Sequence, residues 1–152
     1  MNIENNTILI TGGSRGIGLE MARQLAKKNN KVIVTGRDEQ ALKKVAEKLN
    51  NVSVHQSDVS KPENIAKLYQ SIIKAFPDLN IVINNAGIME TINLQNNNLS
   101  AAELTDEIDI NLKGTILVNN AFVPLLKQKN NAAIINVSSG LAFVPQPIVP
   151  VY

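Results

Sequence analysis

The sequence has no cysteine and no tryptophan, and its one histidine is His55. Without cysteine, a disulfide framework, a thiolate zinc site and a cysteine nucleophile are all excluded. No cluster of carboxylates accompanies His55 at ligand spacing, so we assign it neither a metal nor a general-base role. The absence of cysteine is compatible with a reducing compartment, and we expect a cytoplasmic protein.

Long apolar runs and a strong excess of one charge are also absent. No stretch approaches the roughly 18 apolar residues that span a bilayer, and residues 1–6 lack the basic and apolar regions of a signal peptide. The formal net charge is +2, which is too small to indicate nucleic-acid binding. With 152 residues, 44% of them hydrophobic, we expect one globular domain over residues 1–152.

A glycine-rich turn lies close to the N-terminus. Residues 7–10 form an apolar run typical of a buried strand, residues 11–18 read Thr-Gly-Gly-Ser-Arg-Gly-Ile-Gly, and a helical pattern follows. This order predicts a phosphate cradle, because the N–H groups and the dipole at a helix start favour an anion. Glycines permit a tight turn and close approach to a pyrophosphate. No Lys-Ser or Lys-Thr follows, so a nucleoside triphosphatase loop is not expected.

Apolar strands alternate with helical patterns along the rest of the chain. Such alternation predicts a doubly wound α/β fold with a parallel, Rossmann-like sheet, for which we expect the strand order 3-2-1-4-5. Ligands of this fold bind at the carboxyl ends of the strands. Strands are expected at 7–10, 31–35, 52–55, 81–84 and 133–137, and helices at 17–28, after 38, at 62–76 and at 100–129, the last bent near Asn111 or Gly114.

Local signals predict several details of these elements. Ile17, Met21 and Leu25 recur at helical spacing and are expected to face the core. Asp38 and Ser60 are candidate helix caps, the latter ahead of Pro62 in a first turn. A polar loop is expected from 90 to 98.

Polar residues follow three of the predicted strands. Asp58 comes after the third strand, Asn85 after the fourth, and Ser138 and Ser139 after the fifth. Each alone is an ordinary turn residue. Their position along one edge of a parallel sheet indicates a functional site.

These motifs together resemble the classical branch of the short-chain dehydrogenase/reductase (SDR) family, over nearly the whole chain. Residues 11–18 resemble its cofactor loop, and residues 84–87 match its Asn-Asn-Ala-Gly motif. Asp58 and Val59 resemble its adenine-contacting pair. Asn111 resembles the helix asparagine whose backbone carbonyl holds a relay water in that family.

The resemblance also implies the catalytic residues. In the family a serine lies thirteen residues before the catalytic tyrosine, which points to Ser139 ahead of Tyr152, with Ser138 as its neighbour. A tyrosine hydroxyl acts as general acid or base once its pKa falls from about 10, and a serine hydroxyl can orient a substrate oxygen. The implied activity is hydride transfer between nicotinamide and a small carbonyl or alcohol substrate. The implied cofactor-binding residues are Gly12, Ser14, Arg15, Gly16, Ile17, Gly18, Arg37, Asp58, Val59, Asn85, Ala86 and Gly87.

The residues after the second strand bear on the choice of cofactor. NAD-binding sheets of this type usually carry an acidic residue there, whereas this chain has Arg37. Together with Arg15, Arg37 could hold a 2′-phosphate through charge-assisted hydrogen bonds. Asp38 is a weaker signal for NAD. We therefore predict NADP rather than NAD.

The sequence departs from the family at its C-terminal end. In the family a lysine four residues after the tyrosine lowers the tyrosine pKa, and further strands follow. We therefore expect this chain, ending at Tyr152, to be the N-terminal portion of a longer SDR domain, with little or no turnover by itself. The apolar fifth strand would then be an open edge prone to association, and the full-length protein is expected to be a homo-oligomer.

Two other function classes remain open from the sequence. A non-catalytic dinucleotide sensor or scaffold would keep the cradle without turnover. An S-adenosylmethionine methyltransferase shares the glycine-rich turn but does not predict the spacing of Ser139 and Tyr152.

Overall fold

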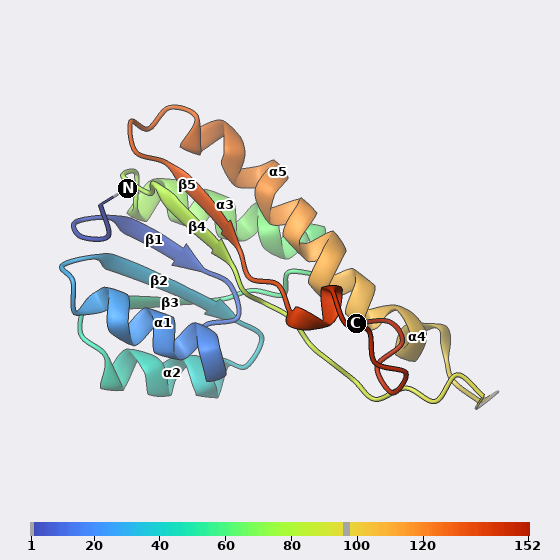
Figure 1. Ribbon diagram of the computed structural model, residues 1–152. Helices are drawn as coiled ribbons and strands as arrows, with labels where there is room; N and C mark the ends of the chain where they lie inside the picture. The colour runs from blue at the N-terminus through green and yellow to red at the C-terminus, as the bar shows by residue number, and fades with distance from the viewer. Residues whose placement is uncertain (1, 96–97) are drawn as a thin grey trace.

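A parallel five-stranded sheet forms the centre of the molecule. The computed structural model describes residues 2–95 and 98–152, so two residues of the predicted polar loop, 96 and 97, lie outside the described part. The sheet order is β3-β2-β1-β4-β5, as predicted (Figure 1). The strands are β1 (Thr7–Ile10), β2 (Lys31–Gly36), β3 (Val52–Gln56), β4 (Ile81–Asn84) and β5 (Ala133–Asn136).

The central position of β1 follows from its apolar side chains. Ile8 lies opposite Val32 of β2 on one side and Ile81 of β4 on the other. All four residues of β1 are buried, as expected for a strand covered on both faces. Because neighbouring strands are parallel, their carboxyl ends lie at one edge of the sheet.

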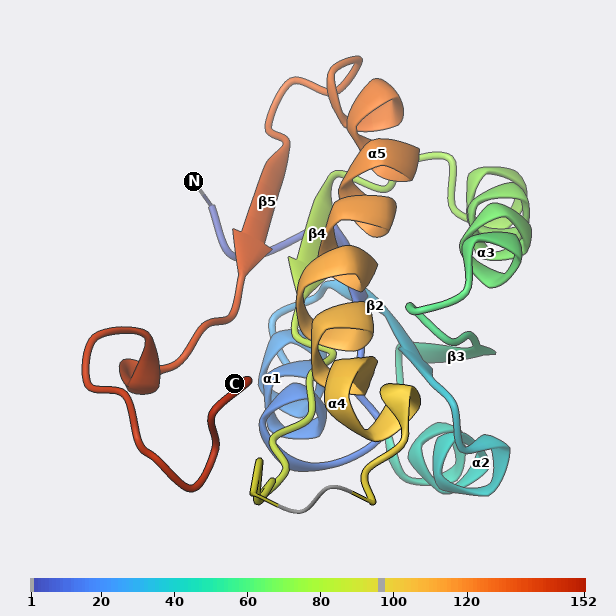
Figure 2. The ribbon, with the colours of Figure 1, turned by 90° about the vertical axis from the view of Figure 1, so that its right-hand side faces the viewer.

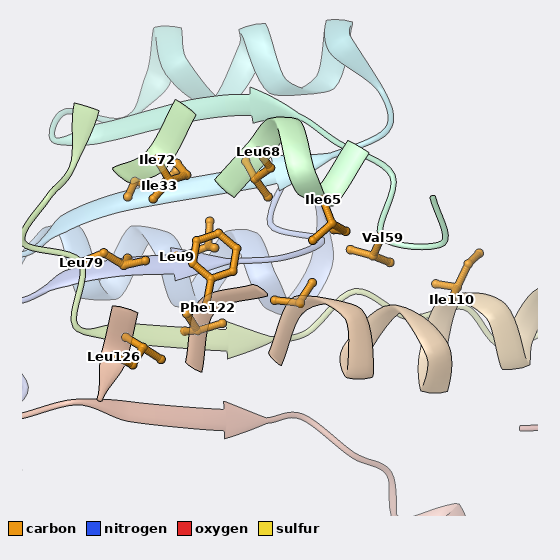
Figure 3. Packing of buried hydrophobic residues seen from close by; sticks show 12 residues of the cluster. Leu9, Ile33, Val59, Ile65, Leu68, Ile72, Leu79, Ile110, Phe122 and Leu126 are labelled. Atoms are coloured by element: carbon orange, nitrogen blue, oxygen red, sulfur yellow. The ribbon is translucent and has the colours of Figure 1, made fainter. Parts of the chain in front are cut away.

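Helices cover both faces of the sheet (Figure 2). Ile8 and Ile10 pack toward the face that Ala22 and Leu42 of the first two helices cover. Leu9 packs into the opposite layer, which contains Phe122 (Figure 3). Alternation along one strand thus supplies two apolar layers. The α-helices are α1 (Gly16–Ala26), α2 (Glu39–Lys48), α3 (Pro62–Ala75), α4 (Ala101–Glu107) and α5 (Gly114–Leu126).

The prediction that Ile17 faces the core was wrong. Its side chain is 68% exposed, and the buried residues of α1 are Gly18 and Ala22. Small residues on the inward face let the start of α1 lie close to the glycine turn. Met21 and Leu25 are partly buried against the core, as expected.

Ser60 is not the cap of α3, contrary to the prediction. The N-cap is Lys61, with Pro62 in the first turn. The Ser60 hydroxyl donates to Asp58 Oδ1 at 2.8 Å, and the Ser60 backbone N–H donates to the same oxygen at 3.0 Å. Asp58 therefore holds Ser60 in a local turn ahead of the helix. The predicted cap at Asp38 is confirmed, since its carboxylate accepts from the Ala41 N–H at 3.0 Å.

The long helical region is continuous through the position of its predicted bend. A π-helix, Ile108–Lys113, joins α4 to α5. Such wide turns insert one extra residue per turn and occur frequently at functional sites. Asn111 lies inside this segment, and Gly114 begins α5.

Strand β5 forms one edge of the sheet (Figure 1). Its side chains Ile134 and Ile135, and Val137 just beyond it, are exposed. After β5 the chain forms a short 3₁₀-helix, Gly140–Ala142, and continues without further helix or strand over the described residues to Tyr152. Within the described part of the chain, no helix has the length and apolar content to cross a membrane.

Candidate cofactor-binding and active site

A cleft of about 850 Å³ opens at the carboxyl ends of the strands. Its lining includes every residue named above as a cofactor-binding or catalytic candidate. They come from the turn after β1, the ends of β2 and β3, the segment after β4, the π-helix and the segment after β5. The structure therefore brings together residues from Gly12, close to the N-terminus, to Tyr152.

The glycine turn fits closely against the segment after β4. Gly12 has φ +66°, and a Cβ there would lie 2.7 Å from Ala86 Cα. A Cβ on Gly18 would lie 2.6 Å from the Gly12 carbonyl oxygen. Both distances are shorter than side-chain contacts allow, so this packing requires glycine at both positions.

The start of α1 faces the cleft without a side-chain cap. Arg15 is the N-cap residue and makes no side-chain capping bond. Residues 16–18 line the cleft. The positive end of the helix dipole is thus available to an anion, as the sequence predicts for the phosphate cradle.

Thr11 and Asn85 connect the glycine turn to the end of β4. The Thr11 hydroxyl accepts from the backbone N–H groups of Asn85 and Ala86, each at 3.1 Å. The Asn85 side-chain amide donates to the carbonyl oxygens of Thr11 and Gly12, each at 3.0 Å. The Asn85 side chain therefore stabilises the glycine turn, in addition to lining the cleft.

Asn84 continues this polar network toward β5. It is buried, and its amide donates to the side-chain oxygens of Asn119 and Asn136, each at 2.8 Å. The backbone N–H of Val137 donates to the Asn84 carbonyl at 2.9 Å. These bonds fix the strand that leads to Ser138 and Ser139.

The side-chain amide of Asn111 forms two hydrogen bonds with the backbone of Ile88. Its Oδ1 accepts from the Ile88 N–H at 2.9 Å, and its Nδ2 donates to the Ile88 carbonyl at 2.8 Å. Its own backbone carbonyl accepts from the Thr115 hydroxyl at 3.0 Å. The side chain of Asn111 thus holds the segment after β4 against the π-helix.

Ser139 and Tyr152 both line the cleft. The Ser139 hydroxyl oxygen accepts from the Leu141 N–H at 3.1 Å and so caps the 3₁₀-helix. Because a hydroxyl accepts and donates together, its proton remains available to a substrate oxygen. The Tyr152 side chain is exposed, and its backbone N–H donates to the Val149 carbonyl at 3.3 Å.

The cleft contains two basic residues, one at the N-cap of α1 and one just after β2. Arg15 and Arg37 line it together with Gly36 and Asp38. Within residues 2–95 and 98–152, neither arginine forms an ion pair. Asp38 already accepts the first free N–H of α2, so this carboxylate is engaged in capping the helix.

Some lining residues were not identified from the sequence. Ser57 is buried, and its hydroxyl has no partner among the described residues. Met89 also lines the cleft, and its side chain is exposed. Ser57 immediately precedes the candidate Asp58, and Met89 lies two residues past the Asn-Asn-Ala-Gly motif. Their closeness in sequence to residues that follow a strand could have identified them. No group of three or more potential metal ligands occurs in the described part of the chain.

Comparison with known proteins assigns this arrangement to a family. The sequence model of the family described as "short chain dehydrogenase" matches residues 6–152. The chain belongs to the short chain dehydrogenase family. This membership confirms the resemblance of the motifs at 11–18, 84–87 and 135–139, and it separates the chain from the methyltransferase alternative.

The relatives of this chain carry differing names. The uncharacterized oxidoreductase DltE of Bacillus subtilis (strain 168) is 40% identical over 152 residues, which are 100% of this chain and 60% of DltE. The (+)-neomenthol dehydrogenase of Arabidopsis thaliana is 36% identical over 158 residues, covering 88% of this chain and 53% of that protein. The chain thus spans little more than half to three fifths of these relatives.

A solved structure shares the fold closely. The 3-ketoacyl-(acyl-carrier-protein) reductase from Brucella melitensis, solved as a complex with NADH, matches with a TM-score of 0.90 and 27% sequence identity. The match covers 99% of this chain and 64% of the reductase. The fold of this family therefore extends over nearly all of the chain.

Proposed function

We propose that the protein is an NADP-dependent oxidoreductase that moves a hydride between nicotinamide and a small carbonyl or alcohol substrate. The observation that supports this most directly is the single cleft shared by the glycine turn, Asn111, Ser139 and Tyr152. A pure dinucleotide sensor needs the glycine turn but has no need of a serine and a tyrosine in the same cleft.

The cleft fits a dinucleotide at its glycine turn. Gly12 and Gly18 leave no room for a Cβ, so the backbone itself forms the wall that a diphosphate would meet. The uncapped start of α1 supplies N–H groups and a positive dipole for that diphosphate. Asp58 and Val59 line the cleft beside β3 and would contact the adenine. When bound, the cofactor supplies or accepts the hydride.

The preference for NADP rests on charge at the end of β2. Arg15 and Arg37 line the cleft without an acidic partner among the described residues. Asp38, the acid that would favour NAD, is engaged by the Ala41 N–H. Two free guanidinium groups favour a ligand that carries an additional phosphate.

The remaining residues handle the proton and the substrate oxygen. Tyr152 would exchange a proton with the substrate oxygen as general acid or base. Ser139 would donate a hydrogen bond to that oxygen and orient it. Asn111 would organise a water relay through its backbone carbonyl, and its side chain holds the segment that follows β4.

We also propose that the protein is a homo-oligomer. Ile108, Leu112 and Ile116 are exposed at four-residue intervals along the π-helix and α5, and therefore form one apolar stripe. Strand β5 offers a second apolar edge.

The test of the proposed function is a titration of the protein with NADPH and NADH, followed by the fluorescence of the reduced nicotinamide. The proposal expects saturable binding with tighter affinity for NADPH. It then expects oxidation of bound NADPH by a small ketone or aldehyde in the protein that carries this chain, and loss of that oxidation in the Tyr152→Phe variant. Binding without oxidation by any carbonyl in a broad screen would favour the sensor.

A further inference from the structure

A buried carboxylate lies outside the cleft that is described above. Glu107, the last residue of α4, is 3% exposed. One of its oxygens, Oε1, accepts the backbone N–H of Glu90, and the other, Oε2, has no partner among the described residues. Removing a carboxylate from water is costly unless it is well paired. We therefore ask which part of the structure the buried Glu107 carboxylate stabilises.

Glu107 holds a loop whose first part Asn111 already binds. Asn111 binds both backbone groups of Ile88, and Glu107 binds the N–H of Glu90 two residues later. Glu107 and Asn111 are four residues apart, and the first three residues of the π-helix lie between them. Residues spaced in this way lie on neighbouring positions of one helical face, so the two side chains hold one strip of backbone.

The same loop supports the segment that carries Tyr152. The Ile92 N–H donates to the Ile148 carbonyl at 3.3 Å. Ile92 is 8% exposed and Val149 is 5% exposed, although most of their chain neighbours are exposed. The Tyr152 N–H then donates to the Val149 carbonyl at 3.3 Å. A continuous path of contacts thus leads from Glu107 through the loop to Tyr152.

We propose that Glu107 is a positioning residue for Tyr152. By fixing Glu90, it places Ile92 where the segment 148–152 can dock, and it thereby sets the position of the Tyr152 ring at the cleft. Preorganised supporting groups of this kind hold a reacting side chain in its productive geometry. The catalytic role of Tyr152 rests on the proposed function, whereas the effect of Glu107 on the position of the Tyr152 ring does not.

The chain offers a direct probe of this coupling, because Tyr69 and Tyr152 are its only tyrosines and it has no tryptophan. Labelling with 3-fluorotyrosine gives two ¹⁹F signals, which the Tyr69→Phe variant assigns. Tyr69 lies on α3 with its ring 5.4 Å from that of Phe122 and packs against the core. The Tyr69 signal therefore reports global folding, and the Tyr152 signal reports local placement.

Two substitutions of similar size separate the acceptor from the charge. Glu107→Gln keeps an oxygen that can accept from Glu90, and Glu107→Met removes it. The proposal expects the Tyr152 signal of Glu107→Met to move toward the shift of free fluorotyrosine and to narrow, with the Tyr69 signal unchanged. Glu107→Gln is expected to restore most of the wild-type Tyr152 signal. Asp106→Met, at an exposed neighbouring position, should leave both signals in place.

An unchanged Tyr152 signal in Glu107→Met would overturn the proposal. Loss of the Tyr69 signal as well would mean that Glu107→Met does not fold. In that case Ile92→Ala tests the next contact in the path. The proposal again expects the Tyr152 signal to move toward free fluorotyrosine, and an unchanged Tyr152 signal would overturn it. NADPH titration of the Glu107 variants keeps the two proposals apart. The affinity of the Glu107 variants for NADPH should stay within about twofold of wild type, because their glycine turn is intact. If the wild type itself does not bind NADPH, that result would count against the proposed function and not against the positioning role of Glu107.

Discussion

The side-chain amide of Asn85 lies 3.0 Å from the carbonyl oxygen of Gly12 and donates a hydrogen bond to it. This bond joins the segment after β4 to the turn after β1, two segments that are 73 residues apart in the sequence. The Thr11 hydroxyl adds two more bonds in the opposite sense, to the backbone N–H groups of Asn85 and Ala86. The shape of the glycine turn is therefore set jointly by two neighbouring strands.

Loss of the Thr11 hydroxyl should weaken both the fold and the cofactor site. Thr11→Val keeps the shape of the buried side chain but leaves the N–H groups of Asn85 and Ala86 without their acceptor. Unpaired buried groups of this kind cost about 1–3 kcal/mol each. We expect a lower free energy of unfolding in urea and weaker NADPH binding. Thr11→Ser keeps the hydroxyl and should remain close to wild type; equal behaviour of the two variants would contradict this role.

Removal of the Arg37 guanidinium should weaken NADPH binding selectively. The lost charge-assisted bonds to a 2′-phosphate correspond to about a tenfold loss of NADPH affinity, with little change for NADH. Arg23→Ala is the matched control, because Arg23 is a partly exposed arginine of α1 that pairs with Glu20 and does not line the cleft. A ratio of NADPH to NADH affinity that is the same in Arg37→Ala and wild type would refute the phosphate clamp.

Much of this site was predictable because the sheet order follows from simple patterns. Buried strands that alternate with helices place Asp58, Asn85 and Ser139 at one edge. The side-chain direction of Ile17 was not predictable, because apolar spacing alone cannot tell a helix face toward the core from one toward a cleft. The burial of Glu107 was also not predictable, since a charged residue in an amphipathic helix is ordinarily assigned to solvent. Both depend on tertiary contacts with distant segments.

Stability should depend on pH through His55. Partial burial lowers the pKa of His55 below its usual value, and its ring lies 6.2 Å from the ring of Phe76. The unfolded chain therefore binds a proton more readily than the folded one. The contribution of neutral His55 is present above a pH of about 6.5 and is lost as the pH falls through and below that value. Urea unfolding at a series of pH values should show that the free energy of unfolding falls as the pH falls below about 6.5, and this dependence should be weaker in His55→Gln. The same pH dependence in both proteins would contradict the role of His55.

The open edge of the sheet should make the chain associate. Ile135 is exposed on β5, which has no neighbour on its outer side among the described residues. Unpaired apolar edges promote contacts between chains. Sedimentation velocity should show concentration-dependent association that Ile135→Lys reduces and Ile3→Lys, at another exposed position, does not. A monomer at every concentration would exclude this edge as an association site.

The most direct test of the central claim is calorimetric titration of NADPH into the wild-type protein and two glycine variants, each first shown to be folded by circular dichroism. Gly18→Ala would place a Cβ 2.6 Å from the Gly12 carbonyl oxygen, whereas Gly140→Ala points into open space. If the glycine turn holds the diphosphate, wild type and Gly140→Ala bind NADPH at one site with equal affinity, and Gly18→Ala binds at least about tenfold more weakly. No binding to the wild type, or equal binding by all three proteins, would contradict the claim.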